Sequence, residues 1–171
     1  MHYSKIEKCD LANGPGIRLS LFVSGCEKHC KGCFNSEAWD RNYGQEFTEE
    51  IIQEIIKEIE EKNLAGLSIL GGDPLEDYNL EMVNKLIDEF QKHFGQSKTI
   101  WMWTGYTIDE IVNKSECWKV ARKVDVLVDG PFVLSKKDLS LPFRGSKNQC
   151  IIDIQASQTF NTLILKEEYN N

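Results

Sequence analysis

Long hydrophobic runs are missing from this 171-residue sequence, and so is any excess of positive charge. Its apolar segments are strand-sized, such as residues 19–23, far below the roughly 18 residues that a membrane-spanning helix needs. The formal net charge is −7, and no cluster of lysine and arginine indicates a nucleic-acid-binding face. Residues 1–8 are polar and lack the apolar core of a signal peptide. We therefore expect a cytoplasmic protein that binds neither nucleic acid nor membrane.

Internal repeats, low-complexity segments and linkers rich in proline, glycine or serine are also missing. The content of 41% hydrophobic and 27% charged residues is ordinary for a globular protein. Because nothing divides the chain and its length suits one domain, we predict a single domain over residues 1–171.

The six cysteines are unevenly distributed. Three of them, Cys26, Cys30 and Cys33, fall within eight residues, and the other three are scattered. Disulfide-dense domains are mostly small and secreted, which does not suit this chain. The distribution therefore predicts one metal site and three ordinary thiols.

Short apolar strands alternate with amphipathic helices along the chain. The predicted strands cover residues 17–23, 67–70, 100–103, 124–128 and 150–154, with a further candidate at 162–165. Helices are predicted over 49–62, from about 80 to a stop near Gly95, and after a capping box formed by Thr107 and Glu110. This order implies an α/β fold with a parallel sheet and right-handed crossovers. A closed eight-fold barrel needs about 250 residues, so we predict an open partial barrel or a doubly wound sheet.

Four loops follow predicted strands. They are the cysteine loop, the turn at 71–74, the turn at 104–105 and the turn at 129–130. In either fold the functional loops lie at the carboxyl ends of the strands. We therefore expect these four loops to converge on one rim.

The cysteine loop has the spacing C-x3-C-x2-C. Three thiolates on one short loop can hold three corners of an iron–sulfur cube, which leaves one iron without a protein ligand. An open iron can coordinate a substrate, as an open zinc position does. The amino and carboxylate groups of a methionine moiety suit that position, and one electron passed into an attached sulfonium would cleave a C–S bond.

Two other interpretations of the loop stay open. Cys26, Cys30, Cys33 and His29 could form a structural zinc site, although such sites normally draw on two separated ligand pairs. Cys30 and Cys33 alone could form a redox C-x-x-C pair, although this leaves Cys26 unexplained. Spacing favours the open cluster over both.

Several motifs surround this loop in a specific order. They are NGPGIR at 13–18, LFVSGCEKHCKGCFN at 21–35, GGDPL at 71–75, WMWTGY at 101–106, VLVDGPF at 126–132 and FRGSKNQ at 143–149. Together they resemble the activating proteins of anaerobic (class III) ribonucleoside-triphosphate reductases, in the radical S-adenosylmethionine superfamily. The resemblance covers about residues 1–150, and residues 151–171 form a C-terminal strand or tail of unknown role.

The resemblance implies an open partial (β/α) barrel of the radical-SAM type with a mainly parallel sheet. It implies a [4Fe–4S] cluster on Cys26, Cys30 and Cys33, with one open iron that binds S-adenosylmethionine. The resulting radical would remove a hydrogen from a glycine of the large subunit of an anaerobic ribonucleoside-triphosphate reductase. Flavodoxin or a similar donor would supply the electron, and the family allows for a homodimer. Another glycyl-radical enzyme or a small molecule are alternative substrates.

The resemblance also suggests contacts for S-adenosylmethionine. Gly32, Cys33 and Phe34 would lie against the adenosine, although many superfamily members carry their aromatic residue before the third cysteine rather than after it. The segment Gly71, Gly72 and Asp73 resembles the family's Gly-Gly-Glu motif with aspartate in place of glutamate. In it, the Gly72 carbonyl is a candidate to bind the methionine amino group.

Weaker signals lie at the ends of the later strands. Thr104 is a candidate ligand-loop residue, and Asp129 either orients ribose hydroxyls or only forms a turn. Trp101 and Trp103 share one face of a strand, where core packing is favoured over stacking on adenine. Arg144 could pair with a carboxylate or lie solvated on the surface.

Overall fold

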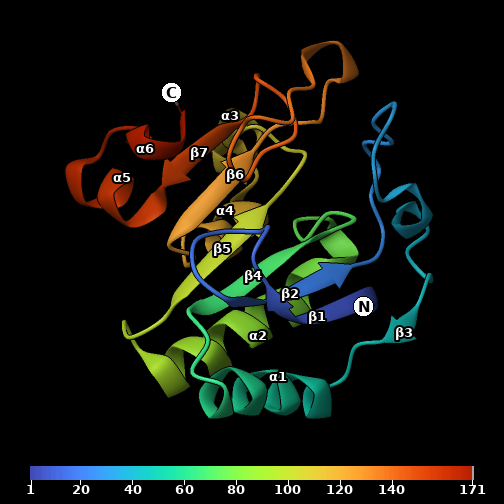
Figure 1. Ribbon diagram of the computed structural model, residues 1–171, viewed down its shortest axis with the longest axis vertical. Coiled ribbons are helices and arrows are strands. Elements are labelled where there is room, and N and C mark those ends of the chain that lie inside the picture. Colours follow the sequence, from blue (N-terminus) through green and yellow to red (C-terminus); the bar gives the residue numbers. More distant parts are fainter. Residues whose placement is uncertain (171) are drawn as a thin grey trace.

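The computed structural model describes residues 1–170, which form one seven-stranded sheet and six helices (Figure 1). The strands are β1 (His2–Asp10), β2 (Arg18–Val23), β3 (Gln45–Glu46), β4 (Gly66–Gly71), β5 (Thr99–Trp103), β6 (Val126–Asp129) and β7 (Cys150–Asp153). The helices are α1 (Glu49–Glu61), α2 (Asp77–Phe94), α3 (Ile108–Asn113), α4 (Ser115–Ala121), α5 (Ile154–Phe160) and α6 (Glu167–Asn170). Within residues 1–170, no helix combines the length and the apolarity needed to cross a membrane.

The strand order is β3-β1-β2-β4-β5-β6-β7, and the sheet is not closed. The central strands β2, β4, β5 and β6 are parallel, while β1, β3 and β7 are antiparallel to their neighbours. The α/β prediction is confirmed, and the expected mainly parallel sheet is corrected to a mixed one. The physical reason is visible at β7, where Cys150 pairs with Asp129. The segment between these residues contains no crossover helix, so the chain returns along β6 in the opposite direction.

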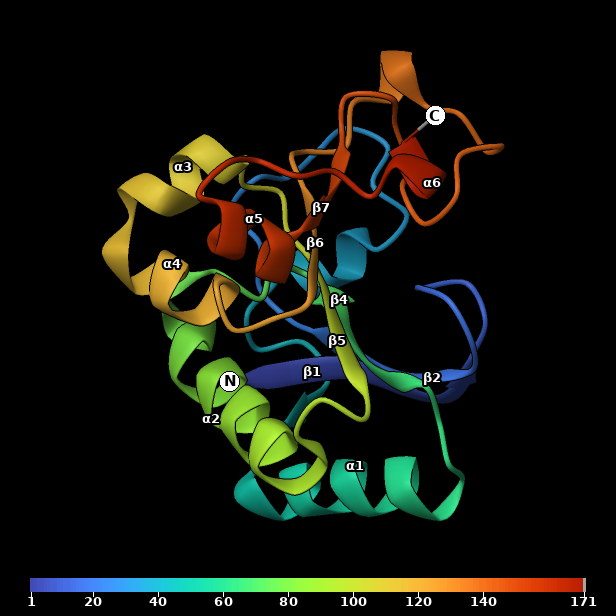
Figure 2. The same ribbon diagram turned by 90° about the vertical axis from the view of Figure 1, so that its left-hand side faces the viewer.

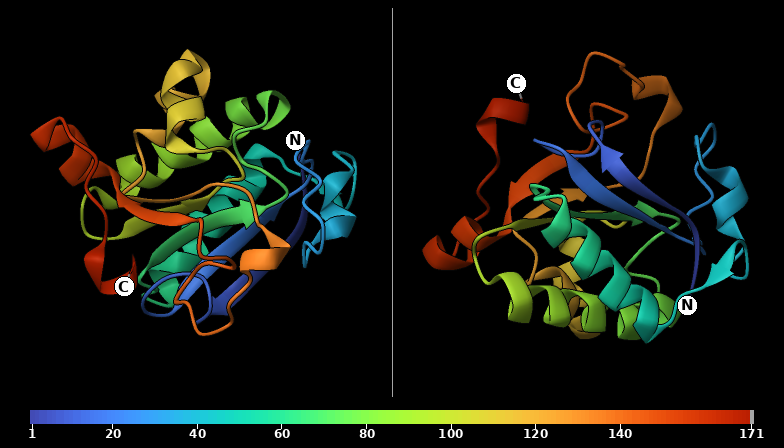
Figure 3. Two further views of the ribbon diagram at one scale, coloured as in Figure 1. Left: turned by 90° about the horizontal axis from the view of Figure 1, so that it is seen from above. Right: turned by 60° about the horizontal axis from the view of Figure 1, so that its bottom comes forward.

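The helices and the loops cover opposite faces of the sheet. Helices α1 to α4 share one buried core with the strand residues that point toward them, including Leu21, Ile69 and Met102. Figure 2 shows α2, α3 and α4 on one side of the sheet, and Figure 3 shows the segment between β6 and β7 on the other. The loop face therefore keeps room for a cavity.

Local sequence signals account for three of the helix boundaries. Thr48 lies at the N-cap of α1, Gly95 ends α2, and Thr107 with Glu110 forms the expected capping box of α3. The candidate strand at 162–165 is wrong, since these residues contribute only a single bridge between Leu165 and Ile152. Strands β1 and β3 and helices α4, α5 and α6 were not anticipated from the sequence.

Arg18 joins three strands from inside the loop face. Its guanidinium is 1% exposed and donates hydrogen bonds to Ser68 Oγ at 2.8 Å, to the Leu67 carbonyl at 2.8 Å and to the Thr99 carbonyl at 2.7 Å. Burial lowers the pKa of Arg18 to about 10, so the side chain is still charged at neutral pH. It therefore stabilises the start of β2 against β4 and β5.

Candidate iron–sulfur site

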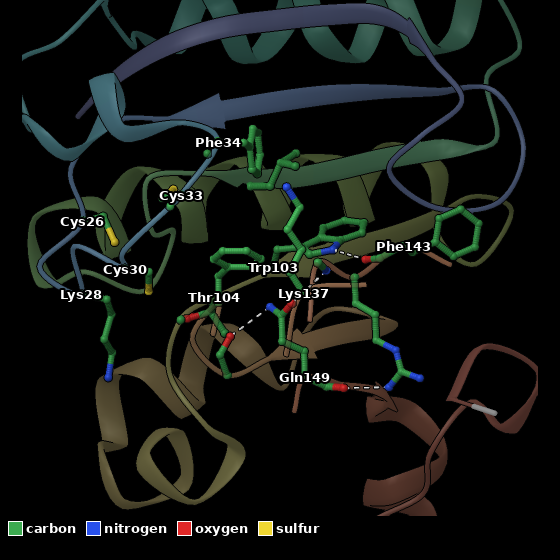
Figure 4. Close-up of a pocket in the computed structure, with 18 of the residues that line it drawn as sticks. Cys26, Lys28, Cys30, Cys33, Phe34, Trp103, Thr104, Lys137, Phe143 and Gln149 are labelled. Atoms are coloured by element: carbon green, nitrogen blue, oxygen red, sulfur yellow. Dashed lines mark hydrogen bonds between the residues drawn. The ribbon is translucent and has the colours of Figure 1, made fainter. Parts of the chain in front are cut away.

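A cavity of about 480 Å³ opens on the loop face, at the carboxyl ends of the parallel strands (Figure 4). Its walls come from the cysteine loop, from Gly71 and Gly72, from the strand end at 103–105, and from the segment after β6. The expected convergence of four loops on one rim is thus observed, with Gly130 rather than Asp129 contributed by the fourth loop. A cavity of this size suits a small-molecule ligand.

The three clustered cysteines all line this cavity and form no disulfide. Figure 4 shows Cys26, Cys30 and Cys33 on one side of it, with Trp103 and Thr104 beside them and Phe143 on the far side. Inside the loop the Cys33 amide donates to the Cys30 carbonyl at 3.0 Å, which makes a turn between these two ligand candidates. Burial raises the pKa of the Cys26 thiol to about 11.

The spacing of the sulfur atoms separates a cluster from a single metal ion. Thiolates bound tetrahedrally to one zinc lie about 2.3 Å from the metal and hence about 3.8 Å from one another. Within residues 1–170 the sulfurs of Cys26, Cys30 and Cys33 are not all within 4.8 Å of one another. A cube holds its thiolates at separate corners, so this donor set fits an iron–sulfur cluster better than a zinc ion.

Asp73 does not line the cavity, but it holds together the turns that surround it. It is 0% exposed, and its carboxylate accepts hydrogen bonds from Thr104 Oγ1 at 2.8 Å, the Gly105 amide at 2.8 Å and the Leu75 amide at 3.0 Å. Burial raises the pKa of Asp73 to about 6, against the opposing effect of these bonds. These bonds orient the Asp73 carboxylate toward the turn at 104–105 and the start of the next helix, and its contact with a ligand stays a prediction.

Glu76 was missed by sequence reasoning, although it lies just beyond the GGDPL motif. It is 5% exposed and accepts from the Glu27 amide at 2.9 Å and from the Tyr106 hydroxyl at 3.0 Å. Lys28 of the same cysteine loop lies 4.1 Å above the Tyr106 ring and pairs with Glu110 at 3.0 Å. These contacts hold the cysteine loop to the starts of α2 and α3.

The two glycines after β4 permit a close contact with the cysteine loop. A Cβ added to Gly72 would lie 2.3 Å from the Gly25 carbonyl oxygen, and the Asp73 amide donates to that same oxygen at 2.7 Å. Gly71 has a φ of +116°, a conformation that disfavours other residues. Glycine is thus required by packing at this turn, independently of any ligand.

The remaining candidates divide between the cavity and the scaffold. Gly32, Phe34 and Thr104 line the cavity, as does Trp103, whose indole donates to the Phe143 carbonyl at 2.7 Å. Trp101 is 2% exposed and packs in a separate aromatic core.

Asp129 and Arg144 both form hydrogen bonds with backbone groups. Asp129 is 6% exposed and accepts from the backbone amides of Ile108 at 2.7 Å and Cys150 at 3.1 Å, outside the cavity wall, so the turn interpretation fits its position. Arg144 lines the cavity and donates to the carbonyls of Gln149 at 2.7 Å and Asn170 at 3.0 Å. It therefore neither pairs with a carboxylate nor lies solvated.

The fold and the cysteine loop define an α/β protein of the iron–sulfur class. Residues 12–152 match the family model described as a 4Fe-4S single cluster domain. More particularly, this chain is 39% identical over 153 residues to a Vibrio cholerae anaerobic ribonucleoside-triphosphate reductase-activating protein, a match that covers 88% of this chain and 97% of that protein. The Escherichia coli (strain K12) protein of that name is 41% identical with the same coverage. The phage T4 protein is 37% identical over 149 residues, covering 87% and 92%. The chain belongs to this family of activating proteins.

Proposed function

We propose that this chain reductively cleaves S-adenosylmethionine at a [4Fe–4S] cluster and uses the 5′-deoxyadenosyl radical to generate a glycyl radical on an anaerobic ribonucleoside-triphosphate reductase. The observation that carries the proposal is that three free thiols on one loop line one cavity. The relatives are activating proteins of that reductase, which supports this choice of partner. Flavodoxin or a similar low-potential donor is the proposed source of the electron.

The residues that line the cavity have different proposed roles. Cys26, Cys30 and Cys33 hold three irons and leave the fourth open. The space for the adenosine is enclosed by Gly32, Phe34 and Thr104. Gly72 offers backbone rather than a side chain to the methionine end, because a Cβ there would strike the cysteine loop. We further propose that residues 1–171 form one domain of the radical-SAM partial-barrel type.

The test begins with anaerobic reconstitution of the full chain. We expect brown protein with about four irons per chain, and formation of 5′-deoxyadenosine when dithionite and S-adenosylmethionine are added. Addition of the reductase should give a glycyl doublet in its electron paramagnetic resonance spectrum. Colourless protein with one zinc per chain, or iron-loaded protein that forms no 5′-deoxyadenosine, would refute the proposal.

Single substitutions assign the ligands. Replacing Cys26, Cys30 or Cys33 by serine should abolish the visible absorbance of the reconstituted protein. The same change at the exposed Cys9, which lies outside the cavity wall, should leave the iron content unchanged. Equal iron loss in the Cys9 variant would contradict the assignment.

A further inference from the structure

The last described part of the chain folds back against β7 and against the segment that lines the cavity. Figure 1 shows α5 and α6 beside β7, at the edge of the sheet. The family model matches residues 12–152, so residues 154–170 lie beyond the region that the family accounts for. We call residues 154–170 the extension, and its role follows from its own contacts.

The side chain of Asn170 joins β7 to the wall of the cavity. Its amide group donates to the Ile151 carbonyl at 2.8 Å and accepts from the Ile151 amide at 3.0 Å, as the facing residue of a paired strand would. The same Oδ1 atom accepts from Arg144 at 3.1 Å, and the Asn170 carbonyl accepts from Arg144 at 3.0 Å. One residue therefore fixes both the outer edge of β7 and the Arg144 guanidinium.

Arg144 depends on these contacts for its direction. It lines the cavity and forms no salt bridge with any residue that the structure describes. Its other hydrogen bond goes to the Gln149 carbonyl at 2.7 Å, inside its own loop. A long side chain has many rotamers, and a bond within the loop lets it move with that loop. Asn170 instead ties the guanidinium to the sheet.

Tyr169 supports the same wall through its ring. The ring lies edge-on to Phe143, with centroids 5.1 Å apart, and to Trp101 at 5.7 Å. Phe143 lines the cavity, and its carbonyl accepts from the Trp103 indole at 2.7 Å. Figure 4 shows this hydrogen bond as a dashed line that links the Phe143 side of the cavity to Trp103, beside Thr104. A shift of the extension would therefore reach the part of the cavity next to Thr104.

Protection of the sheet edge explains only part of these contacts. The extension already pairs with β7 through its backbone, because the Asp153 amide donates to the Ile164 carbonyl at 2.9 Å and the Lys166 amide donates to the Ile151 carbonyl at 2.9 Å. Such pairing is enough to cover an exposed edge. The contacts with Arg144 and Phe143 add nothing to it, and both of these residues belong to the cavity.

We propose that the extension holds the wall formed by Phe143, Arg144 and Gln149, the far wall, in its ligand-binding shape, with Asn170 as the positioning residue for Arg144. The inference rests on the proposed function, because the ligand in question is S-adenosylmethionine. A wall that is formed before binding loses little conformational entropy when the ligand enters, which raises the affinity. Without Asn170 the wall has to be ordered at each binding event, and the affinity falls.

The experiment compares Asn170→Ala with Gln158→Ala in the full chain. Gln158 is a matched control in the same extension, because its amide also accepts from an arginine, Arg122 at 3.1 Å, and donates to the Arg122 carbonyl at 2.8 Å. Neither residue of this control pair lines the cavity. Asn170→Asp keeps an acceptor for Arg144 but loses the donor to Ile151, so it separates the wall from the strand edge.

Two quantities are measured for each variant. The first is the rate of amide hydrogen–deuterium exchange over residues 143–149 in the apo-protein, which reports how firmly the far wall is held. The second is the Kd of S-adenosylmethionine for the anaerobically reconstituted protein. Iron content and melting temperature verify that each variant is loaded and folded.

We expect Asn170→Ala to speed the exchange of residues 143–149 by at least about 10-fold and to raise Kd by about 10-fold, while Gln158→Ala stays within about 2-fold in both. Asn170→Asp should stay within about 3-fold of the wild type, because its carboxylate still accepts from Arg144.

Four results overturn the inference. Wild-type exchange in Asn170→Ala shows that the far wall is held by other residues, and faster exchange with an unchanged Kd shows that the wall plays no part in binding. Equal effects of Gln158→Ala and Asn170→Ala mean that the extension acts through overall stability alone. An Asn170→Asp variant as impaired as Asn170→Ala refutes the role assigned to Arg144.

The inference and the proposed function fail separately. If the reconstituted wild type binds no S-adenosylmethionine, the proposed function is wrong, and the exchange rates of the apo-protein still decide whether Asn170 holds the far wall. If the wild type forms 5′-deoxyadenosine while Asn170→Ala exchanges and binds as the wild type does, the proposed function stands and the inference is wrong.

Discussion

Replacing Glu76 by alanine should weaken the attachment of the cysteine loop. The buried carboxylate accepts one hydrogen bond from the Glu27 amide of that loop and another from the Tyr106 hydroxyl. Without it, both donors lose their partner. We expect a less stable protein that incorporates less iron, because the ligand loop is held less firmly when it meets the metal.

The magnitude follows from where each donor lies. The Tyr106 hydroxyl is buried, so the loss of its acceptor costs about 2 kcal/mol, whereas water can reach the Glu27 amide and the cost there is about 1 kcal/mol. Removal of the Glu76 charge returns about 1 kcal/mol, because that charge repels the buried carboxylate of Asp73. The net loss of about 2 kcal/mol corresponds to a melting temperature lowered by about 4–8 °C.

The assay is anaerobic thermal and denaturant unfolding of the apo-protein, followed by iron analysis after reconstitution. Glu76→Gln is the conservative variant, since its amide can accept from Glu27 and donate to the Tyr106 oxygen, and we expect a loss below about 1 kcal/mol. Glu81→Ala, an exposed change on the same helix, is the control. If Glu76→Ala unfolds and loads iron as the wild type does, the proposed attachment of the loop is wrong.

Three further predictions concern residues that support the site. Gly72→Ala should lower the free energy of unfolding by about 3 kcal/mol and reduce iron loading, because its Cβ would overlap the Gly25 carbonyl. Gly95→Ala, whose Cβ meets no atom within 4 Å, should lower it by only about 1 kcal/mol, and equal losses in the two variants would contradict this reasoning. The raised pKa of Asp73 means that its stabilising contribution is present below pH 3.8 and is lost as pH rises through about 6. Denaturant unfolding of the apo-protein at pH 4 and pH 7 should therefore show that this group lowers the free energy of unfolding by about 2 kcal/mol at the higher pH, a fall that is missing in Asp73→Asn; parallel pH dependences of the two proteins would refute this. Arg18→Met should lower the free energy of unfolding by about 3 kcal/mol, because the buried oxygens that accept from the guanidinium lose their hydrogen-bond donor. A change below about 0.5 kcal/mol would show that these oxygens obtain other donors.

Local patterns in the sequence were sufficient for the elements with strong periodicity or caps. The isoleucine stripe of α1, the glycine after α2 and the capping box of α3 depend on neighbours a few residues apart, and each was found where expected. The direction of β7 could not be read in this way. Its polarity depends on the path of residues 130–149, which have no helical period and fold back on themselves through long-range contacts.

The roles of acidic residues near the site also could not be predicted from local sequence patterns. Asp73 and Asp129 follow strands as ligand residues would, but the structure turns both carboxylates toward backbone amides. Whether such an oxygen faces a cavity or the interior depends on which amides lie nearby. Glu76 shows the opposite failure, since it resembles an ordinary residue at the start of a helix and its partners lie 49 and 30 residues away.

The cysteine loop and the order of motifs are properties of the sequence alone, because ligand spacing on one short loop is a local feature. From them followed the iron–sulfur site and the family, while the alternation of apolar strands with amphipathic helices gave the α/β class. Only the tertiary structure decided which strand ends meet at the cavity, which acidic groups hold the loop in place, and that Phe34 and Leu139 line the same cavity. These two residues are more than a hundred positions apart, and their proximity arises from the packing of separate loops over one face of the sheet.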